Sequence, residues 1–110
     1  MKNDRFLSMI GLAAKAGKVA SGEFSTEKAV KEGRAHLVII SEDASNNTKK
    51  RFVNMCTYYQ VPYAIVYDKD TLGYGIGRQM RSSLAITDSN FAKGLRNLKP
   101  ELISDTKDTE

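Results

Sequence analysis

The feature that most constrains the fold is the apolar run from His36 to Ser41, inside a chain of 110 residues. Its four central residues, Leu-Val-Ile-Ile, are all apolar, and three of them are β-branched. A continuous run of this kind is typical of a strand that is covered on both faces, because a half-exposed strand alternates apolar and polar residues. The run therefore predicts a central strand with further structure packed above and below it.

The rest of the chain alternates between strand-like and helix-like segments. Two more apolar runs and one short extended piece predict further strands, at residues 63–67, 84–87 and 18–20. Apolar residues at helical spacing predict helices between them, at residues 4–16, 22–32, 48–60, 68–77 (a short helix that ends in a loop) and 89–98. Strands that alternate with helices over short gaps favour an α/β sandwich, in which a small sheet carries helices on both faces.

Capping residues mark the ends of these predicted helices. Asp4 and Asp88 stand before the first and last helix, where an Asp side chain accepts a hydrogen bond from an unpaired N–H group. Gly17 and Gly33 follow two of the helices, as a C′ glycine does. Ser21 is expected to be the N-cap of the second helix. The buried stripe of the third helix is expected to contain Phe52, Met55, Cys56 and Tyr59.

Length, charge and cysteine content bound the class of protein. We expect one domain over residues 1–100, followed by an acidic, disordered tail over residues 101–110. The chain carries a net charge of +4, and its last ten residues hold four acids against one lysine, so residues 1–100 carry +7. A basic body of this size favours a polyanionic partner. The chain shows no membrane span and no signal peptide, and its single cysteine makes no internal disulfide, so we expect a cytoplasmic setting. It shows no long exposed apolar helix either, so we expect a monomer.

The segment from Lys18 to Lys28 is the first candidate for a functional site. It turns at Ser21-Gly22 and continues directly into the second predicted helix. The first N–H groups of a helix are unpaired and lie at the positive end of its dipole, where a phosphate or the edge of a base can bind. The two lysines add positive charge on either side. We therefore predict that this helix start is the centre of an RNA-binding surface.

The loop from Leu72 to Arg81 is the second candidate. Arg78 and Arg81 flank Gln79 and Met80 after three closely spaced glycines. Guanidinium and backbone N–H groups suit phosphates and base edges, and an exposed apolar residue can stack on an unpaired base. Composition leaves open the alternative of a mobile polar loop without a ligand. The predicted RNA-binding residues are Lys18, Gly22, Glu23, Ser25, Lys28, Arg78, Gln79, Met80 and Arg81.

Little in the sequence supports an enzymatic function. His36 begins a core strand and Cys56 lies on a buried helical stripe, so both are expected to be structural. The acids Glu42-Asp43, between a strand and a helix, are typical of turn and capping residues. The glycines from Gly73 to Gly77 match only part of a dinucleotide-binding fingerprint, because they end a short helix and lead into a strand. We predict no catalytic residue, metal ion, cofactor or small-molecule substrate, and a nucleotide-binding enzyme stays as a third hypothesis.

Several short motifs, taken together, resemble a known family. In chain order they are Gly22, Lys28-Ala-Val30, Gly33, Leu37-Val-Ile-Ile40, Glu42-Asp43, Val61-Pro-Tyr63, Leu72-Gly73 and Gly77. They resemble the kink-turn-binding ribosomal protein family, often called the L-seven-Ae and L-thirty-e family. Further motifs are similar to its bacterial YlxQ-type branch, namely Gly11-Leu-Ala, Lys18-Val19, Ser21-Gly-Glu23, Glu42-Asp-Ala-Ser45, Asn47-Thr48 and Tyr58-Tyr-Gln-Val-Pro-Tyr63. The resemblance covers about residues 5–98.

This resemblance implies a three-layer α/β/α sandwich with a small mixed sheet, and a non-enzymatic function in RNA binding. The implied RNA is a kink-turn, a sharply bent internal loop with tandem sheared G·A pairs. The family contacts it with the start of the second helix and with the loop before the last strand. The family's helix-start motif, Gly-x-Asn-Glu-x-x-Lys, matches at Gly22 and Lys28, but Phe24 and Ser25 replace its Asn and Glu. The resemblance therefore implies kink-turn recognition with an altered sequence preference.

A second hypothesis comes from a different class of function. The chain would then be a protein-interaction module that keeps the fold and has lost its specificity for kink-turns. Phe24, Tyr74 and Met80 would form an exposed apolar patch for a protein partner. Salt distinguishes the two hypotheses, because RNA binding weakens steeply with salt through counterion release, whereas a hydrophobic contact does not.

Overall fold

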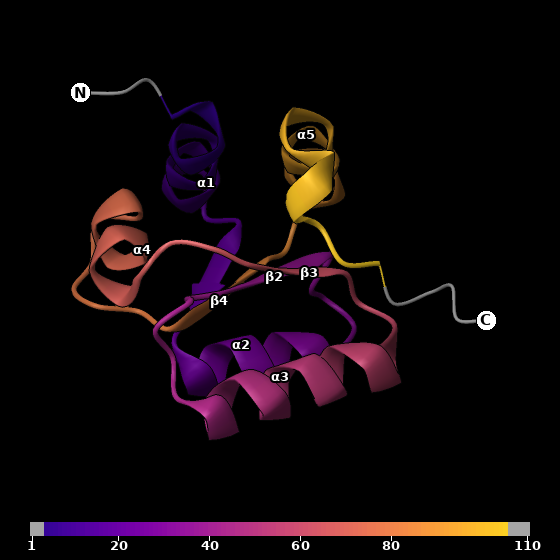
Figure 1. Ribbon diagram of the computed structural model, residues 1–110. Helices are drawn as coiled ribbons and strands as arrows, with labels where there is room; N and C mark the ends of the chain where they lie inside the picture. Colours follow the sequence, from indigo (N-terminus) through magenta and orange to yellow (C-terminus); the bar gives the residue numbers. More distant parts are fainter. Residues whose placement is uncertain (1–3, 106–110) are drawn as a thin grey trace.

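The computed structural model describes residues 4–105 and contains one sheet of four strands (Figure 1). The strands are β1 (Val19–Ser21), β2 (Leu37–Ile40), β3 (Tyr63–Ile65) and β4 (Ser83–Ile86). Their order across the sheet is β1-β4-β2-β3. β4 runs antiparallel to both β1 and β2, whereas β2 and β3 are parallel, so the sheet is mixed as predicted.

Helices cover both faces of this sheet and make three layers (Figure 1). One face carries α1 (Arg5–Lys15), α4 (Lys69–Gly75) and α5 (Ser89–Leu98). The other face carries α2 (Glu23–Lys31) and α3 (Asn46–Tyr59), and the 3₁₀-helix η1 (Pro100–Leu102) follows α5. The predicted α/β/α sandwich is confirmed. None of the helices in the described range is long and apolar enough to span a membrane.

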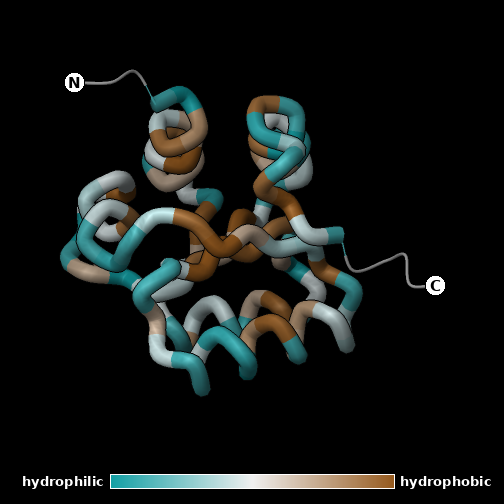
Figure 2. Tube along the Cα trace, viewed as in Figure 1, coloured by the Kyte–Doolittle hydropathy of each residue, from teal (hydrophilic) through white to brown (hydrophobic). Residues whose placement is uncertain are grey.

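The hydrophobic core consists of two clusters, one on each side of the sheet. All four residues of β2 are fully buried. Leu37 and Ile39 belong to the cluster beneath α1, α4 and α5, whereas Val38 and Ile40 belong to the cluster against α2 and α3. Successive side chains of a strand point to opposite faces, so a strand between two helical layers has to be apolar throughout. Figure 2 shows the same distribution, with hydrophobic residues along the sheet and hydrophilic ones on the outer helical surfaces.

The predicted caps Asp4 and Asp88 are confirmed. Their side chains accept hydrogen bonds from the backbone N–H groups of Leu7 and Phe91, at 3.1 and 2.9 Å. Gly17 and Gly33 end helices with a φ of +76° at both positions, which only glycine adopts freely. The α3 helix begins two residues earlier than predicted, because the side chain of Ser45 caps it.

Two local predictions were wrong. Ser21 does not cap α2: it is the last residue of β1, and Gly22 is the N-cap without any side-chain hydrogen bond. Tyr59 does not belong to the buried stripe of α3, since 41% of it is exposed at the last turn. Val53 packs against the core cluster in its place.

The start of the acidic tail also differs from the expectation of disorder over residues 101–110. Residues 100–102 form η1, and Ser104 then forms an antiparallel bridge with Tyr63 on the outer side of β3. The two residues exchange both backbone hydrogen bonds, at 2.7 and 3.0 Å. Asp105 adds an ion pair with Arg96 at 3.2 Å. Residues 106–110, where the rest of the predicted tail falls, lie outside the described range.

Candidate nucleic-acid interface

The sheet brings the two predicted halves of the site together. Gly22, which begins α2, donates its backbone N–H group to the carbonyl of Ser83 at 2.9 Å. Ser21 pairs with Leu84 in the β1–β4 register. Because β4 begins directly after the loop of residues 76–82, this pairing places the start of α2 beside the end of that loop. We call these two elements together the two-part site.

The start of α2 is open to an anion. Gly22 has a φ of +95°, and a Cβ atom built on it would meet nothing within 4 Å. The first hydrogen bond of the helix runs from the N–H group of Thr26 to the carbonyl of Gly22 at 2.9 Å. Within residues 4–105, no side chain caps the N–H groups that come before it. These groups point along the positive end of the helix dipole, an arrangement that binds phosphate and other anions.

Glu23 is engaged with α3. Its carboxylate accepts a hydrogen bond from Thr48 at 3.3 Å and pairs with Arg51 at 3.2 Å. Arg51 also contacts Glu27 at 2.8 Å, and Glu27 pairs with Lys31 at 2.8 Å. Lys31 and then Arg51 lower the pKa of Glu27 by bonding to its charged form, and Glu27 in turn raises the pKa of Lys31. This chain of ion pairs holds the negative charge of Glu23 against α3.

The positive charge of Lys28 is free of such pairing. Lys28 is exposed, and no hydrogen bond or ion pair within residues 4–105 engages its side chain. Phe24 lies one helical turn before it, so both side chains share one side of α2. The Phe24 side chain is 79% exposed and packs on nothing in the core. Ser25, half-buried, lies between them in sequence. This side of α2 therefore combines an aromatic ring, a hydroxyl and an unpaired ammonium group.

The loop begins with a well-defined turn at the end of α4. Gly77 has a φ of +73° and donates its N–H group to the carbonyl of Tyr74 at 3.0 Å, and Arg78 donates to the carbonyl of Gly73 at 2.8 Å. These two bonds form a Schellman motif. The backbone at Gln79 then passes so close to α4 that a Cβ atom on Gly73 would lie 2.0 Å from the carbonyl oxygen of Gln79. Glycine at position 73 is therefore required for this path of the loop.

Arg81 holds the loop in place and links it to β1. Its Nε atom donates to the hydroxyl of Ser21 at 3.2 Å, and its NH1 group donates to the carbonyls of Gln79 and Met80 at 3.3 and 3.0 Å. Its backbone N–H group donates to the carbonyl of Lys69 at 3.1 Å. These bonds make Arg81 a positioning residue for the loop.

The remaining predicted residues separate into two groups. The side chains of Arg78, Gln79 and Met80 are exposed on the loop, which Arg81 links to Ser21. Lys18, in contrast, lies at the opposite end of β1, where its carbonyl accepts a hydrogen bond from Thr87. The three residues of β1 separate it from Gly22, and the four steps along the strand span about 13 Å. The structure therefore separates Lys18 from the other predicted residues, which lie on the first turns of α2 and on the loop.

Sequence analysis missed Asp70 beside this loop, and it named Tyr74 only in the apolar patch of the protein-interaction hypothesis. Asp70 and Tyr74 lie one turn apart on α4, and both line a hollow of about 510 Å³ with residues of the loop. Tyr74 is 82% exposed, the largest exposure among the large hydrophobic residues of the described range. Their spacing of four residues was a usable signal, because it places two side chains on one face of a helix. The hollow itself depends on the path of the loop and has no signal in the sequence.

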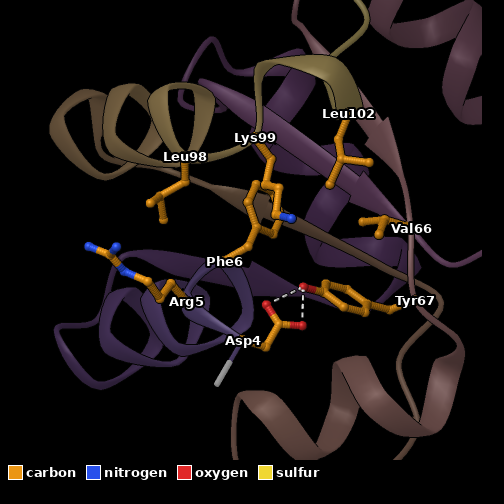
Figure 3. A pocket seen from close by; sticks show the side chains of 8 residues that line it. All are labelled: Asp4, Arg5, Phe6, Val66, Tyr67, Leu98, Lys99 and Leu102. Atoms are coloured by element: carbon orange, nitrogen blue, oxygen red, sulfur yellow. Dashed lines mark hydrogen bonds between the residues drawn. The ribbon is translucent and has the colours of Figure 1, made fainter. Parts of the chain in front are cut away.

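Other chemistry-bearing residues have structural roles. Cys56 is fully buried, and burial raises the pKa of its thiol to about 12, which makes a nucleophilic role unfavourable. Among residues 4–105, no three His, Cys, Asp or Glu side chains gather to hold a metal ion. Figure 3 shows a pocket of about 560 Å³ between the start of α1 and the end of α5. In this pocket the hydroxyl of Tyr67 donates to the carboxylate of Asp4 at 2.9 Å. Burial is the larger cause that raises the pKa of Tyr67, and the hydrogen bond to Asp4 is the second.

The chain is similar to known proteins over most of its length. The model of the ribosomal protein L7Ae/L30e/S12e/Gadd45 family matches residues 4–96. The RNA-binding protein YlxQ of Bacillus subtilis (strain 168) is 42% identical over 98 residues, which span 89% of this chain and 98% of that protein. The RNA-binding protein YlxQ of Enterococcus faecium is 35% identical over 92 residues, 84% of this chain and 88% of that protein.

Two solved structures share the fold. A protein of unknown function from Bacillus halodurans C has a TM-score of 0.84 and 38% sequence identity, covering 87% of this chain and 97% of the other. The Giardia lamblia 15.5kD RNA binding protein has a TM-score of 0.76, covering 93% of this chain and 91% of the other. Its sequence identity is 20%, so this second likeness concerns the fold alone.

Proposed function

This chain belongs to the ribosomal protein L7Ae/L30e/S12e/Gadd45 family, and from that membership we propose that it is a non-enzymatic RNA-binding protein that recognises kink-turn RNA. The observation that carries the proposal is the hydrogen bond from Gly22 to Ser83, because it places the uncapped start of α2 beside the loop before β4. A bent RNA presents phosphates and base edges close together, and the two-part site offers donors for both. We further propose that the protein acts in the cytoplasm as a monomer.

Phosphate binding is proposed for the start of α2 and for Lys28. The open N–H groups there donate to phosphate oxygens, and Lys28 supplies a charge that no acid in residues 4–105 neutralises. Arg78 extends the positive charge to the loop. These contacts depend on the backbone and on cations, so they are compatible with Phe24 and Ser25 at the positions where the family usually has Asn and Glu. They also predict binding that weakens as salt is added.

Base recognition is proposed to differ from the usual family pattern. Glu23 lies two residues before the position of the missing family Glu, but Thr48 and Arg51 hold its carboxylate against α3. It therefore does not substitute for that residue. Ser25 keeps a hydroxyl that donates and accepts, and Phe24 provides an exposed ring for stacking. We expect fewer side-chain hydrogen bonds to the G·A pairs and a correspondingly smaller preference for them.

A pair of RNAs tests the proposal. One is a kink-turn, and the other is the same RNA with its G·A pairs replaced by Watson–Crick pairs, each titrated with the protein at two salt concentrations. We expect tighter binding to the kink-turn at both salt concentrations, with affinity for both RNAs decreasing as salt rises. Equal, salt-sensitive binding to the two RNAs would contradict kink-turn recognition.

The same titration addresses the protein-interaction hypothesis. Phe24, Tyr74 and Met80 are 79%, 82% and 59% exposed, which is unusual for apolar side chains and is the observation that favours a protein partner. Absence of RNA binding at low salt would favour that hypothesis, since a hydrophobic contact does not depend on counterion release.

A further inference from the structure

The pocket of Figure 3 is separate from the two-part site. It measures about 560 Å³ and lies between the start of α1, the end of α5 and the segment that follows β3. None of the residues that line it belongs to the start of α2 or to the loop before β4. Pockets for small ligands begin at about 300 Å³, so this one has room for a large apolar side chain and for the backbone groups beside it.

The floor of this pocket is apolar. The ring of Phe6 lies in the middle of the lining side chains, between the Asp4–Tyr67 pair and the end of α5 (Figure 3). Phe6 is fully buried and forms the fixed base of the floor. Three half-buried residues present apolar surface above it, namely Val66, Leu98 and Leu102. A ligand therefore gains free energy here by burying an apolar group against this surface.

A pair of polar side chains stands on one side of the floor. The hydroxyl of Tyr67 lies 2.9 Å from both carboxylate oxygens of Asp4, and Oδ1 of Asp4 also accepts the backbone N–H group of Leu7 at 3.1 Å. A carboxylate has about four acceptor positions, so Oδ2 of Asp4 has room for a further N–H donor. This side of the pocket therefore accepts an N–H group of a ligand, and it repels a carboxylate.

The backbone of Tyr67 holds this pair in place. Tyr67 has a φ of +65°, which is unfavourable for a residue with a bulky side chain. Its carbonyl accepts the N–H group of Glu42 at 2.7 Å, and its hydroxyl is bonded to Asp4 at the other end of the side chain. Strained conformations of this kind persist where the surrounding contacts enforce them, and they are frequent at ligand sites. The acceptor side of the pocket is thus formed before a ligand binds, which lowers the entropic cost of binding.

Two cations determine the charge of the ligand. Arg5 and Lys99 both line the pocket and are exposed, and neither makes a hydrogen bond or an ion pair within residues 4–105. The lining side chains thus carry two positive charges against the single negative charge of Asp4, which is already hydrogen-bonded. A net positive pocket favours a ligand of net negative charge over a zwitterion. Ammonium and guanidinium groups form charge-assisted hydrogen bonds with a carboxylate.

We propose that this pocket binds the C-terminal residue of a protein partner whose chain ends in a large apolar amino acid. Such a residue carries all three matching groups on one Cα atom: a carboxylate for Lys99 and Arg5, an apolar side chain for the floor, and a backbone N–H group for Asp4. An internal residue of a peptide lacks the carboxylate, a fatty acid lacks the N–H group, and a free amino acid is a zwitterion. The inference goes beyond RNA binding and does not depend on it.

The test is a set of peptide titrations followed by the backbone amide signals of the isotope-labelled protein in NMR spectra. The reference probe is N-acetyl-Gly-Gly-Leu with a free C-terminal carboxylate. Two further probes are the same peptide with a C-terminal amide and the peptide with glycine in place of its leucine. Two small molecules, leucine and 4-methylpentanoate, complete the set. The wild-type protein is compared with Lys99→Gln and Arg5→Gln. Lys93→Gln is the matched control, because Lys93 is also exposed on the α5 side of the molecule but does not line the pocket.

We expect the reference peptide to shift the signals of Phe6, Tyr67 and Leu102, and to leave those of Gly22 and Arg78 unchanged. The amide-ended peptide should bind about tenfold more weakly, because it loses the charge-assisted hydrogen bonds of its carboxylate. The glycine-ended peptide should bind about fivefold more weakly, because it has no apolar group for the floor.

The variants identify the cations that hold the carboxylate. Lys99→Gln should weaken binding of the reference peptide about fivefold, as the loss of an exposed ion pair does, while Lys93→Gln stays within about twofold. Arg5→Gln should also weaken it. The amide-ended peptide should bind Lys99→Gln and the wild-type protein equally well, since it has no carboxylate to pair with the lysine. All three substituted residues are exposed, so the fold is preserved and is checked in the same spectra.

Several results would overturn the inference. They are no shift of the pocket signals with the reference peptide, equal binding of the acid and amide forms, or an effect of Lys99→Gln no larger than that of Lys93→Gln. Binding of leucine or 4-methylpentanoate as tight as that of the reference peptide would overturn the assignment to a protein partner. Failure of the proposed RNA-binding function would leave all of these results unchanged, because the titrations contain no RNA.

Discussion

Replacing Gly73 by alanine tests the close approach of the loop to α4. A Cβ atom at this position would lie 2.0 Å from the carbonyl oxygen of Gln79, 2.5 Å from its carbonyl carbon and 3.0 Å from the Cα atom of Met80. All three neighbours are backbone atoms, so no rotation of a side chain relieves the contact. The chain at Gln79 and Met80 has to move away from the helix.

The change in the free energy of unfolding combines one stabilising effect with two destabilising ones. Alanine in a helix is more favourable than glycine by about 1 kcal/mol. Overpacking that shifts the backbone costs about 1–3 kcal/mol, and a contact as short as 2.0 Å calls for the upper part of that range. The shift also weakens the 2.8 Å hydrogen bond from Arg78 to the carbonyl of Gly73, at about 1 kcal/mol. We expect the free energy of unfolding to fall by about 3 kcal/mol, with weaker RNA binding by the displaced loop.

Urea denaturation and titration with kink-turn RNA measure both effects. The matched control is Gly94→Ala in α5, where a new Cβ atom would meet the sulfur of Met9 at 2.9 Å. Met9 is a flexible side chain and can move aside, so this variant should be at least as stable as the wild-type protein and bind RNA equally well. The reasoning is refuted if Gly73→Ala matches Gly94→Ala in both its denaturation midpoint and its RNA affinity.

Three further predictions concern single side chains. Lys28→Ala should weaken RNA binding by about 1 kcal/mol in the titration with kink-turn RNA. Lys18→Ala, at the far end of β1, should weaken RNA binding less. A larger effect of Lys18→Ala than of Lys28→Ala would contradict the location of the site. Tyr67→Phe should lower the free energy of unfolding in urea by about 1 kcal/mol, because it removes the hydrogen bond to Asp4. Asp68 caps α4 by accepting a hydrogen bond from the backbone N–H group of Thr71, and this bond lowers the pKa of the Asp68 carboxyl. The ionised carboxylate therefore stabilises the folded state above its ordinary pKa of 3.8. This stabilisation is lost as pH falls through the lowered pKa. Asp68→Asn should therefore lose less stability than the wild-type protein between pH 7 and pH 3, and an equal loss would count against this cap.

The fold was predictable because its strongest determinant is local. The apolar run of β2 can only be buried between two layers, and capping residues such as Asp4 and Asp88 mark helix ends within a few residues of chain. The errors arose where tertiary contacts decide. Tyr59 has the correct helical spacing, but it is the last residue of α3 and is 41% exposed. Ser104 is in register with Tyr63 only because η1 turns the chain back toward the sheet.

The candidate site was predictable to the extent that its parts are contiguous in sequence. Gly22 marks a helix start, and Gly77 marks the turn into the loop, so both halves have local signals. The pairing of Glu23 with Arg51 has no such signal, because it depends on how α2 packs against α3. Lys18 is near Gly22 in sequence but is carried away from it by the extended strand between them. Linear proximity over a β-strand is thus a poor guide to proximity in space.

The bridge between Ser104 and Tyr63 has a consequence for how the protein behaves at high concentration. β3 is an edge strand, and an edge strand with free N–H and C=O groups is a template for pairing with another molecule. Ser104 occupies both hydrogen-bonding groups of Tyr63 on that edge. β3 ends at Ile65, so only a very short stretch of this edge stays open beyond Tyr63. The C-terminal segment thus protects the sheet against edge-to-edge aggregation, a role that is independent of any RNA.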